Sequence, residues 1–364
     1  KLFISLILFY SFLFSQKHSF SVQNKNSFGF QNFNYQMMSS TEEEQRYFDD
    51  LPPHLDDIAI RERNSVNITE LLSWGEFQEH TYEAMVKIDD QTLAYSSWVF
   101  NEDDESYPAL IIDDVSDPLN PQRISALGLS GFPSWGSFKI KDNYLFACNS
   151  FFGLDIIDIS DLSNPVMVSH YDYYYADDPY LSARIYDIAF SGDIAFLACR
   201  QGGVKVLDIS DPSNPIDLNT YFSSSGDYID AVEIVDNNLI FGDRSGNVTL
   251  LDISNIYSPE VLSEINIGDH VWDLNVSGNV IDALVLYPFR YAKIIYSENN
   301  ISLANDILEL GCCYSYSFTR SGDFVYIPDE NRFIKIHSPL SNNDDLSVDS
   351  SIDLYSINPL AQIL

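Results

Sequence analysis

Three carboxylates stand at the beginning of strand-like segments, where side chains of this type could bind a ligand. Asp187, Asp230 and Asp273 each follow an aromatic or aliphatic residue and precede an aliphatic one. A carboxylate in such a place accepts hydrogen bonds, ligates a divalent cation, or serves as a general acid or base. Neighbouring positions and two loops add further candidate ligand-binding residues: His270, Trp272, Arg200 and Arg244.

A tyrosine-rich segment offers a second candidate surface. Residues 171–182 read YDYYYADDPYLS, and Tyr173, Tyr174 and Tyr175 stand together in it. Tyrosine rings give contact area at low entropic cost, so this segment suits a protein or glycan partner. The alternative is that the rings pack over the neighbouring strands.

No arrangement in the sequence matches a nucleophile with an adjacent base. The six histidines are scattered, and neither Gly-x-Ser-x-Gly nor His-Glu-x-x-His occurs. We therefore name no catalytic residues, and we leave open whether any residues bind metal. This pattern favours binding over catalysis.

The elements that position these residues follow from an internal repeat. The phrases DVSDPLNP, DISDLSNP, DISDPSNP and DISNIYSP begin at residues 114, 158, 208 and 252, and weaker copies follow. The serine of each copy falls at 116, 160, 210, 254, 297 and 338, so the steps are 44, 50, 44, 43 and 41 residues. A period in the low forties with short strand-like segments is typical of propeller blades.

One unit shows four strands clearly: 184–190, 194–199, 204–209 and 216–222. We predict an all-β fold, a β-propeller of four-stranded blades with six complete units. Seven blades are favoured, because segments 57–63, 66–72 and 356–364 can build a further blade and close the ring without exposed edges. Six blades are the alternative.

These residues resemble the LVIVD-repeat family, whose signature is an apolar strand followed by Asp-Ile-Ser-Asp-Pro. The resemblance covers roughly residues 80 to 340 and weakens in the last two units. It implies a β-propeller of the kind found in bacterial and archaeal cell-surface proteins, and it carries no general catalytic motif.

The repeated acidic turns have two interpretations. Aspartate and serine accept backbone N–H groups in turns, and proline pre-sets the backbone, so we expect turn chemistry and no cofactor. Calcium binding is the alternative, because carboxylates are calcium ligands. The residues concerned are Asp114, Asp117, Asp158, Asp161, Asp208, Asp211 and Asp252. Cys148 and Cys199 each end an apolar strand and are expected to be buried and unbridged.

The composition and the N-terminus predict an exported protein. Residues 1–16 read as a signal peptide, 17–54 as a flexible polar leader, and 55–364 as one propeller domain. With 54 acidic and 19 basic side chains the formal charge is −35, which excludes a nucleic-acid footprint. We expect no transmembrane segment in the mature chain, and a secreted or cell-surface location.

We therefore expect a non-catalytic binding or scaffolding module for an extracellular protein or glycan. The alternative is a propeller hydrolase or lyase with a divalent ion in the central channel. A structural surface protein that only self-assembles is a third option. Four acceptor-type sequons begin at Asn67, Asn247, Asn275 and Asn300 and matter if an exporting cell glycosylates its proteins.

Overall fold

The computed structural model describes residues 84–100, 106–117, 121–129, 137–149, 153–172, 184–304, 307–311, 317–328, 332–340 and 346–353. All of them belong to one of the two units into which contacts divide the chain. Across these ranges the chain forms strands and no helix, and hence no helix long and apolar enough to cross a membrane.

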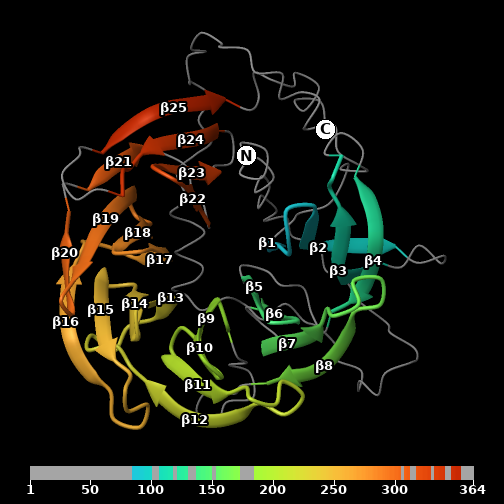
Figure 1. The fold of residues 1–364 in the computed structure, drawn as a ribbon. Coiled ribbons are helices and arrows are strands. Elements are labelled where there is room, and N and C mark those ends of the chain that lie inside the picture. Colours follow the sequence, from blue (N-terminus) through green and yellow to red (C-terminus); the bar gives the residue numbers. More distant parts are fainter. Residues whose placement is uncertain are drawn as a thin grey trace. The chain divides into compact units, whose positions relative to one another are not determined.

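The strands build six antiparallel sheets in chain order (Figure 1). The first contains β1 (Met85–Lys87), β2 (Thr92–Phe100), β3 (Ser106–Asp114) and β4 (Gln122–Gly128). The second contains β5 (Phe138–Lys141), β6 (Tyr144–Asn149), β7 (Gly153–Asp158) and β8 (Val166–Tyr171). The third contains β9 (Asp187–Ser191), β10 (Ile194–Ala198), β11 (Val204–Asp208) and β12 (Ile216–Tyr221).

The remaining sheets follow the same order. The fourth contains β13 (Ile229–Val235), β14 (Asn238–Asp243), β15 (Asn247–Asp252) and β16 (Glu260–Asn266). The fifth contains β17 (Val271–Ser277), β18 (Val280–Val285), β19 (Phe289–Ser297), β20 (Asn300–Leu303) and β21 (Leu308–Gly311), the last two both paired with β19. The sixth contains β22 (Thr319–Ser321), β23 (Phe324–Pro328), β24 (Arg332–His337) and β25 (Ser347–Asp353).

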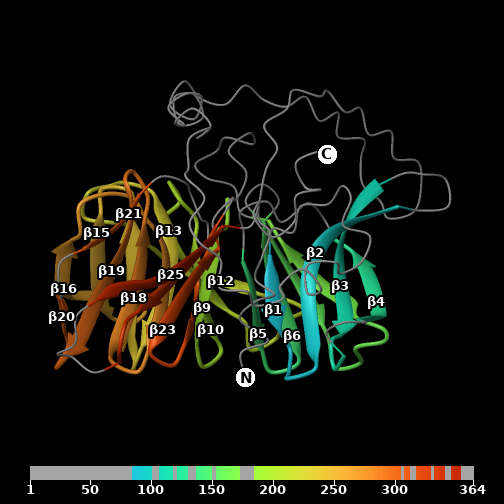
Figure 2. The ribbon, with the colours of Figure 1, turned by 90° about the horizontal axis from the view of Figure 1, so that it is seen from above.

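Each sheet is a propeller blade. The first strands of successive sheets contact one another, β1 with β5, β5 with β9, β9 with β13, and β13 with β17. In Figure 1 the sheets follow one another around a central axis, with their first strands innermost, and Figure 2 shows the same sheets after a 90° turn about the horizontal axis. The predicted all-β propeller is confirmed, and the described residues form six blades, the alternative count. The segments predicted to build a seventh blade lie outside the described residues.

The hydrophobic core lies between adjacent blades. Side chains of the third and fourth sheets form one cluster, in which Phe196 and Phe241 are almost completely buried. Burying a side chain of this size stabilises the fold by about 1.5–3 kcal/mol. Packing is also tight between blades four and five, because a Cβ added to Gly242 would lie 2.2 Å from Cγ1 of the Val271 side chain in the next blade.

Hairpin turns join the first two strands of each blade, and their residue types fit the required backbone. Asp142, Gly192, Asp236, Gly278 and Gly322 all adopt positive φ values between 51° and 64°. Such turns match the twist of paired strands, and Gly, Asn and Asp tolerate them best.

In the first three blades, a residue beside a β-bulge in the fourth strand contacts the next blade. In β4, β8 and β12 the register shifts at the same place. At that place Ser125 donates to the carbonyl of Leu162 at 2.7 Å, and Asn219 donates to that of Ile256 at 2.7 Å. Both acceptors lie in the Asp-Ser turn of the following blade. The repeated turn therefore serves blade-to-blade packing.

Candidate functional site

The strand register separates the three predicted carboxylates into two environments. Asp187 and Asp273 pair directly with residues of the second strand of their blades. Asp230 is instead the unpaired residue of a bulge in β13. Asp230 therefore belongs to one cluster of charged residues, and Asp187 with Asp273 to another.

Asp230 lies at the centre of the first cluster, which we call the Asp230 cluster (Arg200, Asp230, Arg244 and His270). Its Oδ2 lies 2.5 Å from Nε2 of His270 and 3.5 Å from Nε of Arg244. Its Oδ1 lies 3.3 Å from Nε of Arg200. These residues come from strand starts and from loops between second and third strands, which occupy the same end of the blades.

Aromatic rings surround the guanidinium groups of this cluster. The Cζ atom of Arg200 lies 4.9 Å from the ring centroid of Tyr186 and 5.1 Å from that of Tyr228. Arg244 also contacts Tyr228, with its Cζ 4.4 Å from the Tyr228 centroid. Trp272 packs edge-on against Tyr186, at 5.6 Å between centroids. Each stacked cation gains attraction from the ring face, more so where water is excluded.

Most of the Asp230 cluster is shielded from solvent. Asp230 is 1% exposed, His270 3% and Arg200 4%, whereas the Arg244 side chain keeps 18% of its surface. A buried carboxylate is costly unless cations and hydrogen bonds compensate it, and Asp230 has these around it. Tyr228 is also partly exposed. A ligand at this end of the blades would therefore meet Arg244 and Tyr228 first.

The second cluster lies on the innermost strands, and we call it the channel cluster (Lys139, Asp187, Glu233 and Asp273). Nζ of Lys139 in β5 lies 2.7 Å from Oε1 of Glu233 in β13 and 3.3 Å from Oδ1 of Asp187 in β9. The blade between β5 and β13 carries Ala189 at the matching position of its first strand, which leaves room for the long side chains to meet. Lys139 and Glu233 were not singled out in the sequence.

Two of these carboxylates also accept a hydrogen bond from the backbone of the next blade. Asp187 accepts hydrogen bonds from the backbone N–H of Val232 at 3.1 Å and from the Ser137 hydroxyl at 3.0 Å. Asp273 accepts one from the backbone N–H of Phe318 at 3.3 Å. Val232 and Phe318 occupy equivalent positions of blades four and six. Asp187 and Asp273 thus make equivalent hydrogen bonds, one between blades three and four and the other between blades five and six.

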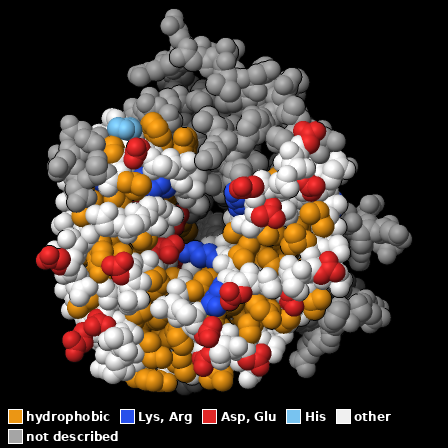
Figure 3. Space-filling view, in the orientation of Figure 1, with side chains coloured by type: hydrophobic (Ala, Val, Ile, Leu, Met, Phe, Trp, Pro, Cys, Tyr) orange, Lys and Arg blue, Asp and Glu red, His pale blue; other side chains and the backbone are white. Residues whose placement is uncertain are grey.

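Burial and neighbouring charges shift the pKa values of Lys139, Glu233 and Asp273. Burial by itself lowers the pKa of Lys139, but the charges of Asp187 and Glu233 raise it above the ordinary value. Burial raises the pKa of Glu233, against the opposing charge of Lys139. Burial, with the Asp187 charge, raises the pKa of Asp273 well above its ordinary value. Figure 3 shows basic and acidic side chains around a hollow near the centre of the viewed face.

In the repeated acidic turns, the first aspartate accepts a hydrogen bond from the backbone of the turn itself. Asp114, Asp158 and Asp208 each accept the backbone N–H two residues later at 2.8 Å. Hydrogen bonds from the following serines lower the pKa values of these exposed carboxyls. No group of three or more His, Cys, Asp or Glu in the described ranges is arranged to hold a metal ion. Calcium binding stays a prediction.

The tyrosine-rich segment and the two cysteines were also singled out in the sequence. Tyr173, Tyr174 and Tyr175 lie outside the described residues, so their contact role stays a prediction. Cys148 and Cys199 are buried and free, as predicted. Burial raises the pKa of the Cys199 thiol to about 12, which makes it unreactive at neutral pH.

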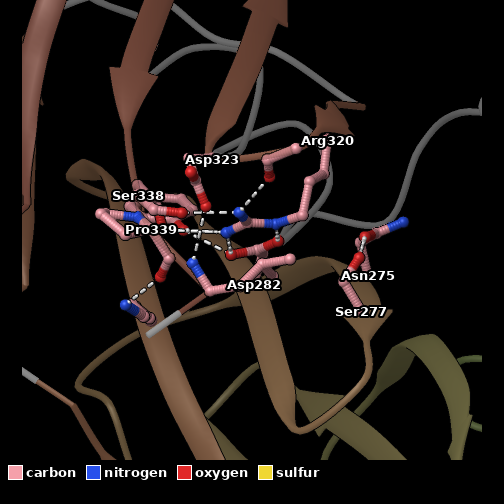
Figure 4. A network of polar contacts seen from close by, with 11 residues as sticks. Asn275, Ser277, Asp282, Arg320, Asp323, Ser338 and Pro339 are labelled. Atoms are coloured by element: carbon pink, nitrogen blue, oxygen red, sulfur yellow. Dashed lines mark hydrogen bonds and ion pairs between the residues drawn. The ribbon is translucent and has the colours of Figure 1, made fainter. Parts of the chain in front are cut away.

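One buried polar network was not predicted from the repeated phrase (Figure 4). Arg320 in β22 binds both carboxylate oxygens of Asp282 in β18, with Nε at 2.6 Å from Oδ2 and Nη2 at 2.5 Å from Oδ1. Arg320 also donates to the carbonyl of Ser338 at 2.6 Å, and Tyr291 donates to Asp282. Equivalent positions in blades three and four hold Phe196 and Ile240, so a polar group here replaces an apolar contact between blades five and six.

The family comparison matches two of the blades. The LVIVD repeat matches residues 136–173 and 184–222, which contain the second and third sheets. These two blades are LVIVD repeats. The match confirms the resemblance in the units where the Asp-Ile-Ser-Asp phrase is most regular. No curated protein sequence matches the chain.

Several solved structures share the propeller fold of this chain. A Bacteroides fragilis protein provisionally assigned as a 6-phosphogluconolactonase has a TM-score of 0.57 and 8% identity, over 76% of this chain and 90% of its own. A similarly assigned Bacteroides uniformis protein has a TM-score of 0.54 and 11% identity, over 78% and 94%. A Desulfotomaculum acetoxidans protein of unknown function has 0.55 and 11%, over 73% and 88%. At such identities the likeness concerns the fold alone.

Proposed function

We propose that this LVIVD-repeat propeller is an exported, non-catalytic binding module for an extracellular protein or glycan. Its working surface is the end of the blades that bears the Asp230 cluster. The observation that carries the proposal is the stack of Arg200, Tyr228 and Arg244 around Asp230, because two cations and an aromatic ring are held in place before any ligand arrives.

The exposure of the stack supports recognition at its outer members. Tyr and Arg are the residues that most often carry binding energy in interfaces, because they combine area with directed hydrogen bonds. Arg244 keeps a partly exposed guanidinium, and Arg200 beneath it is buried. Because Arg244 already contacts Tyr228, which also contacts the buried Arg200, ordering Arg244 on binding costs less entropy. Arg244 and Tyr228 are therefore the residues expected to touch the ligand.

The same geometry argues for binding and against turnover. Asp230 and His270 are the groups best suited to acid–base chemistry, but each is nearly inaccessible and they contact each other. In the channel, the ammonium of Lys139 occupies the place between carboxylates that a divalent ion would need. These contacts weigh against the alternative of a hydrolase or lyase with a channel ion.

Export is part of the proposal. The basic start and apolar run within residues 1–16 have the pattern of a signal peptide, and the strong acidity suits an extracellular setting. The LVIVD repeat is associated with cell-surface proteins, which points the same way. The partner is therefore sought among extracellular proteins and glycans.

The test is binding of the full chain to panels of extracellular glycans and surface proteins, followed by variants. Arg244→Ala and Tyr228→Ala are each expected to weaken a partner found this way by roughly 30-fold, as for an interface hot spot of about 2 kcal/mol. Tyr257→Ala is the matched control, since Tyr257 is 67% exposed and lies in the turn between β15 and β16, away from the Asp230 cluster. Full binding by the Arg244 and Tyr228 variants would refute the proposed surface.

A further inference from the structure

Three of the four sequons fall within the described residues, and the structure places them in different settings. In the first, Asn247 donates through Nδ2 to Asp243 at 3.0 Å and accepts through Oδ1 from Asn266 at 2.8 Å. The hydroxyl of Thr249 is buried and donates to Glu264 at 2.9 Å. Both members of this sequon are engaged in the blade.

The second sequon lies on an innermost strand. Asn275 in β17 is partly buried and accepts a hydrogen bond from the Ser277 hydroxyl at 3.4 Å (Figure 4). Strand alternation places it on the same side of β17 as Asp273, a member of the channel cluster. A large substituent at this place would have to fit among the innermost strands.

The third sequon lies at the outside of blade five. Asn300 begins β20, directly after a tight turn in which Glu298 and Asn299 have positive φ. Asn300 and Ser302 are exposed, whereas Ile301 between them is 2% exposed. The amide and the hydroxyl therefore project on one outward face. Oδ1 of Asn300 accepts from the Ser263 hydroxyl at 2.9 Å, which orients the amide nitrogen away from that contact.

We propose that Asn300 is an N-glycosylation site of this protein. In the reaction, the amide nitrogen of Asn300 attacks the anomeric carbon of a lipid-linked oligosaccharide diphosphate. A C–N bond forms, the C–O bond to the diphosphate breaks, the lipid diphosphate leaves, and the amide loses one proton to a base. The inference rests on export, one part of the proposed function, because the donor is found at secretory membranes.

A glycan at this place has a physical consequence for the blade. In the described part of the sheet, β20 pairs with β19 on one side and with no strand on the other. Open strand edges invite pairing with another chain, and proteins commonly cover them. Leu303 at the end of the same strand is 40% exposed. An oligosaccharide on Asn300 would cover this edge.

The experiment has two arms. In the first, the full chain behind an initiator methionine is expressed in yeast, so that its own N-terminal segment directs it. In the second, the full chain behind an established secretory leader is translated with microsomes. Glycan number is read from the gel shift removed by endoglycosidase, and the site from mass spectrometry of the peptide containing residue 300.

The expected result is one glycan fewer in Asn300→Gln and in Ser302→Ala than in the unaltered chain. Ser302→Thr, which keeps the sequon, and Asn247→Gln are expected to leave the glycan number unchanged. Ser302→Ala also keeps the Asn300 contact with Ser263, so its effect reports the sequon and not the fold. An unmodified residue 300 in the microsome arm would overturn the proposal. A glycan at residue 300 in that arm with no export in yeast would support the site and overturn export through the chain's own N-terminal segment.

Discussion

The Ser169 hydroxyl in β8 donates a hydrogen bond of 2.7 Å to the carbonyl of Pro212, in the turn of the next blade. Ser169 pairs with Ile156 directly beside the register shift of β8, where Val168 is left unpaired. The acidic phrase that marks the repeat thus has two tasks: its first aspartate closes the turn, and its later backbone carbonyl receives a side chain from the preceding blade. A repeat of this kind is stabilised mainly by contacts between neighbouring units.

Removal of this link is expected to weaken blade packing. Ser169→Ala should lower the free energy of unfolding by about 1 kcal/mol, the usual net contribution of one hydrogen bond. Denaturant midpoints of the two proteins measure the change. Tyr257→Ala, at a side chain that is 67% exposed, is the control and should leave the midpoint unaltered. Equal midpoints for Ser169→Ala and the unaltered chain would show that the contact contributes nothing.

Asp230 is expected to be the most sensitive position of its cluster. Asp230→Ala would leave the Arg200 guanidinium buried beside Arg244 without the carboxylate, and breaking such a buried pair costs about 3–5 kcal/mol. Urea unfolding is the measurement. Arg244→Ala should cost less, because the Arg244 side chain is partly exposed. The reverse order would show that Asp230 does not hold the cluster together.

Asp273 should make the fold less stable as pH rises. Its folded-state pKa is raised above the unfolded value of 3.8, so its contribution is fully present below that pH and is lost as pH rises through the folded pKa. Asp273→Asn keeps an acceptor for the Phe318 N–H and removes the charge, so the variant should be more stable than the unaltered chain at neutral pH.

Asp187→Asn is the matched comparison for this effect. It removes a charge that contacts Lys139 at 3.3 Å, and is expected to destabilise the protein at neutral pH. Unfolding midpoints over a pH series distinguish the two variants. If Asp273→Asn were less stable than the unaltered chain at neutral pH, the charge of Asp273 would not be the destabilising one.

Gly242 tests how closely blades four and five approach. A Cβ at this position meets the Val271 side chain at 2.2 Å, so Gly242→Ala is expected to cost about 1–3 kcal/mol through overpacking. The double variant with Val271→Ala should recover part of the loss, because it removes the atoms that clash. Thermal unfolding of the single and double variants measures both. Additive losses would mean that the two positions do not touch.

Local sequence determined the elements and their order. The strand predicted at 194–199 is β10, and the strand at 204–209 is β11, each within one residue of its end. Alternating apolar residues, turn residues with positive φ and the acidic phrase are local signals, so they specify strands and turns without reference to the rest of the chain. The repeat period then implied blades.

Only the tertiary structure decided which side chains meet. Lys139 contacts Glu233, 94 residues away, and nothing local to either residue indicates the pair. Asp230 occupies the bulged position of β13, which Trp272 occupies in β17, one residue before the position that Asp187 and Asp273 share. Asp282 and Arg320 meet because a buried position of one blade faces the first strand of the next. The sequence determines the period of the strands, whereas register and blade-to-blade packing determine the neighbours of each charge, because a charge in the interior lies where a compensating partner can reach it.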